Sequence, residues 1–133
     1  MTLCADWIAE GAGNHGSTFA GNPIVAAAAG ATLAGIQSRD VPANAAAVGE
    51  YLRAELGAAV DAHDLPVREV RGEGLMIGVE VKRGSMRVLR DLAIEEGVLA
   101  LPAGRSVVRL LPPLIIDEQH ADSVVESLVE VLS

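Results

Sequence analysis

The spacing of apolar residues changes from a helical to an alternating period near Val67, and no single type of secondary structure accommodates both periods. Before this point, apolar residues over 43–62 recur every three or four positions, which predicts an amphipathic helix following Pro42. After it, residues 67–71 alternate between apolar and charged, and 75–81 form a second apolar run. These two segments are predicted to be strands joined by a glycine-containing turn over residues 72–74. The chain must therefore combine helices with a small sheet.

Shorter segments complete this pattern. A helix over 24–36 is expected to be buried because it is apolar nearly all round. The remaining expected elements are a helix over 86–96 that ends at Gly97, strands over 98–101 and 106–110 separated by Pro102, Ala103 and Gly104, and a last helix begun by Asp117. This order of helices and strands predicts a small α+β unit with one face of its sheet covered.

The composition limits both the core and the partners. Half of the 133 residues are hydrophobic, but 22 residues are alanine and only three are aromatic, so the core must consist of small aliphatic side chains. The net charge of −8 would repel nucleic acid and anionic membrane surfaces. One lysine stands against nine arginines. The acidic surface reflects either ordinary solvation or adaptation to high salt, and one sequence leaves both open.

Several absences bear on location. The single cysteine, Cys4, excludes an internal disulfide and is interpreted as a small buried residue. No charged start followed by an apolar run and a cleavage site is present. The apolar stretch over 24–33 is too short to span a bilayer. We therefore expect a cytoplasmic protein.

A polar loop over 11–21 contains four glycines together with His15, Ser17 and Thr18. It leads into Asn22, a good helix N-cap residue, followed by a proline at the first helical position. Two hydroxyls beside a glycine can bind a phosphate. Loops of this kind also serve as ordinary capping loops, so the residues alone leave both interpretations open.

Arg109 lies within the apolar run 107–111, and this run ends directly before two consecutive prolines. A charged residue in such a strand needs a partner, because burying it unpaired is costly. Its guanidinium fork matches a carboxylate with two parallel hydrogen bonds, so it could bind the carboxylate of a substrate. The alternative is a structural ion pair with Glu69, Glu80 or another acid.

The other candidate motifs give little evidence for a functional site. His63 and His120 are expected at the surface, and no spacing of His, Cys, Asp or Glu indicates a metal site. The glycines over 72–78 do not follow a strand and open a helix, which excludes a nucleotide-binding loop.

Two separated motifs, in this order, resemble the C-terminal part of class-III aminotransferases, which use pyridoxal 5'-phosphate (PLP). They are His15-Gly16-Ser17-Thr18-Phe19-Ala20-Gly21-Asn22-Pro23 and Val107-Val108-Arg109-Leu110-Leu111-Pro112-Pro113-Leu114. The resemblance covers essentially the whole chain and is best to the branch that handles acetylornithine and related ω-amino acids. It implies the end of the large domain over 1–42 and the small C-terminal α/β domain over 43–133 of a fold-type-I PLP-dependent transferase.

The resemblance also implies roles for individual residues. Thr18 would bond the cofactor phosphate in the active site of the other subunit of a homodimer, and Ser17 would lie beside it, facing the substrate. Arg109 would bind the α-carboxylate of the substrate. Residues 98–116 resemble a sub-branch whose ornithine or lysine precursors are tethered to a small amino-group carrier protein. Ala20 stands where many relatives have glycine, which leaves both hydroxyls in place.

The family's Schiff-base lysine has no counterpart here, because the only lysine, Lys82, stands elsewhere in the sequence. No catalytic residue is therefore assigned, and the chain alone is expected to be inactive. Three hypotheses follow. The chain is a fragment of an arginine- or lysine-pathway aminotransferase, one half of a split enzyme that assembles with a separate large-domain chain, or a stand-alone domain that binds a small anion or a partner protein without catalysis.

Overall fold

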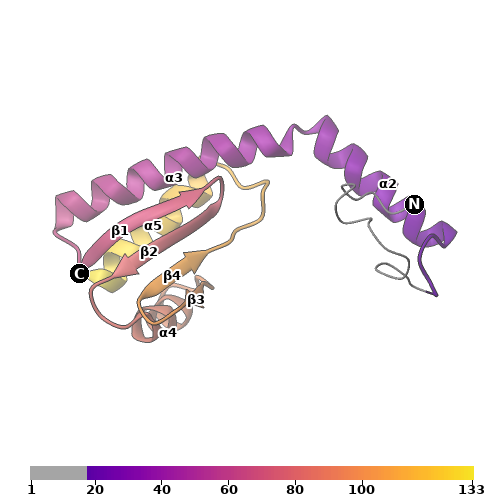
Figure 1. Ribbon diagram of the computed structural model, residues 1–133. Coiled ribbons are helices and arrows are strands. Elements are labelled where there is room, and N and C mark those ends of the chain that lie inside the picture. Colours follow the sequence, from indigo (N-terminus) through magenta and orange to yellow (C-terminus); the bar gives the residue numbers. More distant parts are fainter. Residues whose placement is uncertain (1–17) are drawn as a thin grey trace, which may run out of the picture. The chain divides into compact units, whose positions relative to one another are not determined.

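The computed structural model describes residues 18–133 (Figure 1). Contacts divide the chain into two units, Met1–Arg39 and Asp40–Ser133, and each is described by itself. Helix α2 (Pro23–Ser38) belongs to the first unit. The second contains α3 (Val41–His63), β1 (Val67–Glu73), β2 (Met76–Val81), α4 (Ser85–Glu95), β3 (Leu101–Ala103), β4 (Val107–Leu110) and α5 (Glu118–Leu132). The predicted α+β class and the order of elements are confirmed.

Local capping signals place several helix ends where the sequence predicts them. The Asn22 side-chain oxygen accepts a hydrogen bond from the amide of Val25 at 3.0 Å, and α2 begins with a proline. Asp117 accepts one from the amide of His120 at 3.1 Å at the start of α5. Gly97, with φ +70°, follows the end of α4 in the left-handed conformation that such a cap requires.

The prediction that α2 is buried is wrong. No residue of α2 is buried within the described part of the chain, and Ile24 is 82% exposed. A helix that is apolar all round is buried only where neighbours pack against every side. Such cover is missing among residues 18–133. None of the helices in that range is long and apolar enough to cross a membrane.

The four strands form one antiparallel sheet in the order β1-β2-β4-β3. In β2, Ile77 and Val79 are at most 1% exposed, whereas Gly78 between them is only half-buried. Because successive side chains of a strand point to opposite faces, one face of the sheet is packed and the other is open. Ile77 pairs with Leu110 and Val79 with Val108, so the packed face continues onto β4.

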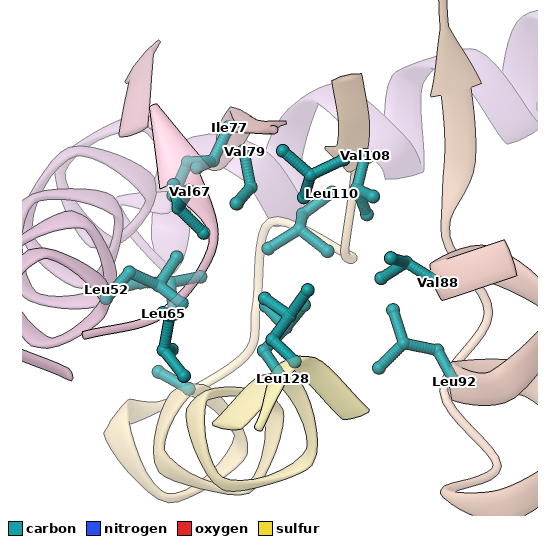
Figure 2. Packing of buried hydrophobic residues seen from close by; sticks show 14 of the residues in the cluster. Leu52, Leu65, Val67, Ile77, Val79, Val88, Leu92, Val108, Leu110 and Leu128 are labelled. Carbon is teal, nitrogen blue, oxygen red and sulfur yellow. The ribbon is translucent and has the colours of Figure 1, made fainter. Parts of the chain in front are cut away.

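The three helices of the second unit contribute to the packing on that face. Figure 2 shows Leu52 of α3, Leu92 of α4 and Leu128 of α5 directed toward strand residues such as Val67 and Leu110. Each of these helical leucines is at most 1% exposed, and burying one contributes about 1.5–3 kcal/mol. Within the described residues, the buried cluster consists entirely of Ala, Val, Leu and Ile, as the composition predicted.

Two strand boundaries differ from the predictions. The turn between β1 and β2 consists of Gly74 and Leu75, and residues 72–73 belong to β1 instead. The strand expected over 98–101 is β3, which starts only at Leu101 and includes Pro102. A proline has no amide to donate, and an edge strand tolerates it because such a strand is paired on one side only. Periodicity alone could not show that β3 is an edge strand.

Helix α3 touches the β1–β2 turn through the backbone. A Cβ atom added to Gly49 would lie 2.1 Å from the carbonyl oxygen of Gly74, closer than any real contact. Gly74 has φ +53°, a conformation that glycine adopts at low cost. The helix can approach the turn this closely because Gly49 has no side chain.

We predict that Gly49→Ala lowers the free energy of unfolding by about 2 kcal/mol, because helix and turn must separate to admit the methyl group. Gly57→Ala is the matched control. Gly57 lies in the same helix, and a Cβ atom there would meet nothing within 4 Å. This substitution should raise stability by up to about 1 kcal/mol through helix propensity. Urea unfolding of both variants measures the difference, and equal effects would contradict the close contact.

Tyr51 links α3 to α5. Its hydroxyl donates a hydrogen bond to Asp122 Oδ1 at 2.7 Å. The carboxylate stabilises the neutral phenol, and this hydrogen bond is the largest of the effects that raise the pKa of Tyr51 to about 12. The folded protein therefore keeps a proton that the unfolded chain loses near the ordinary tyrosine pKa of about 10.

Because Tyr51 is the only tyrosine, its ionisation can be followed by ultraviolet absorbance. We expect a midpoint near pH 12, and Asp122→Asn should move it toward about 10. Stability should fall as pH rises between these two values, because the unfolded state then binds fewer protons than the folded state. Asp61→Asn, on α3 but outside this hydrogen bond, should leave the midpoint unchanged. A midpoint near 10 in the unsubstituted protein would refute the interaction.

Candidate functional site

Arg109 lies on the open face of the sheet. The register pairs it with Gly78 on β2 and with Leu101 on β3. Its Nε atom is buried and has no hydrogen-bond partner among the described residues. Leaving a buried donor unsatisfied costs about 1–3 kcal/mol, so such a group calls for an explanation. An oxygen atom of a ligand would satisfy it.

The nearby acids that could neutralise Arg109 are bound to other arginines. Arg71 Nη1 lies 2.6 Å from Glu69 Oε2 and 2.9 Å from Glu80 Oε2. Glu80 also lies 3.7 Å from Arg68. No ion pair within residues 18–133 includes Arg109, so its structural pairing with Glu69 or Glu80 is not what the structure shows. The pKa of Arg71 is raised above its ordinary value, chiefly by its hydrogen bond with Glu80 and then by the one with Glu69.

A hollow of about 280 Å³ adjoins Arg109 on this face. Arg71, Gly78 and Arg109 lie in one row across β1, β2 and β4, and all three line the hollow. Gly78 contributes no side chain between the two arginines, and a Cβ atom there would lie 3.2 Å from Val107 Cγ1. The hollow is close to the lower size limit of small-molecule sites. It therefore has the size and the charge to bind a small carboxylate.

A second hollow, of about 380 Å³, lies among apolar residues that include Leu99, Pro112 and Val124. The ionisable side chain on its lining is His120, whose Nδ1 atom lies 2.5 Å from Asp117 Oδ1. This hollow offers no arginine or lysine for an anionic ligand. We place the candidate site at Arg109 because an unpaired cation meets open space there.

Thr18 belongs to the first unit, in the turn that precedes α2, and it is exposed. Asn22 joins this turn to the helix, because its side-chain nitrogen donates to the carbonyl of Phe19 at 2.9 Å. Its backbone carbonyl and side chain accept the amides of Ala26 and Val25, so these two amides are not free for a phosphate. The exposed hydroxyl of Thr18 is a donor in this turn that a phosphate could use.

The other residues singled out in the sequence either lie outside the described residues or lie away from the hollow at Arg109. Ser17 and His15 lie outside the described residues. Lys82 is exposed on the bend after β2, where its amide donates to the carbonyl of Pro66 at 2.7 Å. Thr18 and Arg109 belong to different units, so each is described within its own unit. Among residues 18–133, no three His, Cys, Asp or Glu side chains gather as a metal site.

Sequence reasoning missed Arg71 and Gly78 as parts of this site. Both lie in segments that were interpreted only as strands and a turn. Their relation to Arg109 depends on the pairing of three strands, which no local pattern specifies. The alternation within β2 and within β4 was a usable signal, since it predicts that Gly78 and Arg109 each face away from the core.

The chain matches the aminotransferase class-III family over residues 2–132. It belongs to this family. It is 41% identical over 122 residues to a LysW-aminoadipate semialdehyde transaminase of Deinococcus radiodurans. This alignment covers 92% of this chain and 28% of that protein. It is 40% identical over 121 residues to an acetylornithine aminotransferase of Methanothermobacter thermautotrophicus, covering 91% and 30%.

Solved structures agree with this membership. An acetylornithine aminotransferase from Elizabethkingia anophelis superposes with a TM-score of 0.76 at 31% identity, over 89% of this chain and 32% of that one. An ornithine aminotransferase from Toxoplasma gondii, with partial occupancy of PLP at its active site, has a TM-score of 0.79 at 29% identity, over 92% and 29%.

Class-III aminotransferases are PLP-dependent transferases, and the similarity to them extends across both units of this chain. The chain spans about 30% of the length of the curated relatives that it matches. The fold-type-I assignment made from the sequence is confirmed by these structural neighbours.

We predict that Arg109→Met leaves the free energy of unfolding unchanged or raises it by up to about 1 kcal/mol, because it removes an unsatisfied buried donor and keeps the aliphatic packing. Arg71→Met is the matched control and should lower stability, since it breaks two ion pairs. Denaturant unfolding compares the two. A loss of 1 kcal/mol or more for Arg109→Met would indicate a structural partner for this guanidinium.

Proposed function

We propose that this chain is the C-terminal part of a PLP-dependent aminotransferase that moves an ω-amino group between acetylornithine, or a carrier-linked ornithine or lysine, and 2-oxoglutarate. The observation that carries the proposal is the unpaired guanidinium of Arg109 beside a hollow on the open sheet face. The names of the relatives, which include acetylornithine and LysW-linked substrates, support this choice of substrate class.

Arg109 binds the α-carboxylate of the substrate in this proposal. A guanidinium and a carboxylate form two parallel charge-assisted hydrogen bonds, which fix both position and orientation. The buried neighbours of Arg109 on β4, Val108 and Leu110, are at most 5% exposed and anchor the strand in the core. A site on a packed strand holds its ligand more accurately than one on a mobile loop, and this accuracy lowers the barrier to reaction.

Thr18 donates its hydroxyl to the cofactor phosphate. Its exposed position in a turn tied to α2 by Asn22 fits this role, with Ser17 beside it in the sequence. When bound, the cofactor supplies an aldehyde that accepts the amino group and a ring that draws electrons from the reacting carbon. We propose a homodimer in which the loop over 15–23 serves the neighbouring subunit, or else a separate large-domain chain as the partner.

Lys82 does not take part in catalysis in this proposal. It lies on an exposed bend after β2, next to Arg83 and outside the lining of the hollow at Arg109. The lysine that holds the cofactor and transfers the proton must then come from outside this chain. The chain alone is accordingly inactive.

The remaining parts of the proposal follow from the family. Residues 1–42 are the end of the large domain and residues 43–133 are the small domain. The complete protein acts in arginine or lysine biosynthesis in the cytoplasm, and the LysW-linked relatives support a small carrier protein as a partner. The exposed apolar residues of α2, such as Ile24 and Leu33, favour a helix that a further domain covers over a stand-alone binding domain.

We predict that the purified chain, mixed with PLP, acetylornithine and 2-oxoglutarate, forms no glutamate above the blank. Borohydride reduction of the mixture should show no specific, saturable attachment of cofactor to Lys82 by peptide mass spectrometry, because this lysine lies on an exposed bend outside the lining of the hollow at Arg109. Lys82→Arg is the control for background labelling at other amines. Turnover that disappears in Lys82→Arg would overturn the assignment.

The intact mass of the polypeptide recovered from its own cells completes this test. A mass of roughly three times 13.7 kDa is expected, since the relatives are about three times as long as the chain. The upstream part should then contain a lysine that borohydride links to PLP. A native mass of 13.7 kDa, with no large-domain chain co-purifying, would contradict the proposal.

A further inference from the structure

Glu80 occupies a position on the open sheet face from which it can reach either of two arginines. Arg71 and Arg109 both pair with Gly78, one from β1 and the other from β4, and Glu80 lies two residues further along β2. Diagonal neighbours of this kind are about 7–8 Å apart at their Cα atoms, within reach of long side chains. The register alone would therefore allow Glu80 to pair with Arg71 or with Arg109.

The structure shows that Glu80 pairs with the β1 side. Its Oε2 atom lies 2.9 Å from Arg71 Nη1, and its Oε1 atom lies 3.7 Å from Arg68 Nη1. The Glu80 side chain is 24% exposed, so this pairing is only partly screened by solvent. Arg109 has no acidic partner among residues 18–133, although it belongs to the same row as Arg71.

Glu69 shares Arg71 with Glu80. It lies on β1, where its Oε2 atom is 2.6 Å from the same Arg71 Nη1. Glu69 is two strands away from Arg109, which is about 10 Å at the usual strand spacing, so it competes poorly for that guanidinium. Arg71 thus binds two carboxylates, and Glu80 is the one of them that lies diagonal to Arg109.

We propose that Arg71 is a positioning residue that holds Glu80 away from Arg109 and so keeps the Arg109 guanidinium free for a ligand carboxylate. That Arg109 is kept free to bind a substrate rests on the proposed function. That Arg71 restrains Glu80 does not. Without Arg71, Glu80 keeps only its longer contact with Arg68, at 3.7 Å, and it swings toward Arg109 and satisfies it internally. An incoming carboxylate must then displace Glu80 before it can bind.

The test follows the Nε–Hε signal of Arg109 in ¹⁵N-labelled protein, assigned by its loss in Arg109→Lys. In carboxylate-free buffer, Arg71→Gln should shift this signal, because Glu80 now binds the guanidinium. The double variant Arg71→Gln/Glu80→Gln should return it to the position seen in the unsubstituted chain. Arg87→Gln is the matched control, because it removes an arginine whose partner, Asp91, lies on the same helix α4.

A titration with glutarate, a dicarboxylate without the reactive keto group, measures the consequence for binding. Arg71→Gln should raise the midpoint of the Arg109 shift about two- to fivefold, the range for a partly exposed ion pair. Adding Glu80→Gln should restore the original midpoint. A lost fold would not be rescued by removing the neighbouring acid. A simple loss of positive charge would be rescued, because Glu80→Gln removes one negative charge. The Arg109 shift in carboxylate-free buffer therefore carries the test of direct pairing, with Arg71→Lys, which keeps the charge, as its control.

The outcomes separate the two claims. An Arg109 signal that is unchanged in Arg71→Gln without carboxylate, with a native melting curve, overturns the positioning role. If Arg71→Gln does not fold, Arg71→Lys takes its place, since it keeps the charge but loses the Nη1 group that binds both acids. A smaller shift that Glu80→Gln abolishes supports the proposal, and no shift refutes it. An unsubstituted chain in which glutarate never moves the Arg109 signal refutes the carboxylate site itself.

Discussion

The antiparallel register between β2 and β4 is the constraint on which the other features depend. It sets Ile77 opposite Leu110 on the packed face, and it therefore sets Gly78 opposite Arg109 on the open face. A slip of one residue would turn the arginine into the core and the aliphatic side chains into solvent. Because aliphatic burial outweighs any single surface pair in free energy, the packing of the core decides where this charge lies.

The open face combines several cations with an uneven distribution of acids. Three guanidiniums, those of Arg68, Arg71 and Arg109, share it with the carboxylates of Glu69 and Glu80. Both carboxylates are bound by β1 arginines, which leaves the β4 arginine unsatisfied in a protein of net charge −8. An unsatisfied buried donor lowers stability, so its presence at a hollow supports the proposed carboxylate site over a structural ion pair.

Several features that depend on residues close together in the sequence were predicted correctly, and several that depend on distant residues were not. Helix starts at Asn22 and Asp117 and the end at Gly97 were predicted because a cap involves residues within one turn. The burial of α2 was predicted wrongly because an apolar surface can be read from the sequence, whereas the neighbours that would cover it cannot. Pro102 was assigned to a turn because its tolerance in β3 depends on that strand lying at the edge of the sheet.

The sequence by itself determined the order of elements, the aliphatic core and the family motif around Arg109, since periodicity, composition and short motifs are all read along the chain. Only the tertiary structure decided which acids Arg109 meets. Arg71, Gly78 and Arg109 are separated in sequence by up to 38 positions and become neighbours through two strand pairings. Hydrogen-bond register between strands is set by the packing of the whole core, so the choice of Glu80 for Arg71 over Arg109 cannot be read from any local pattern.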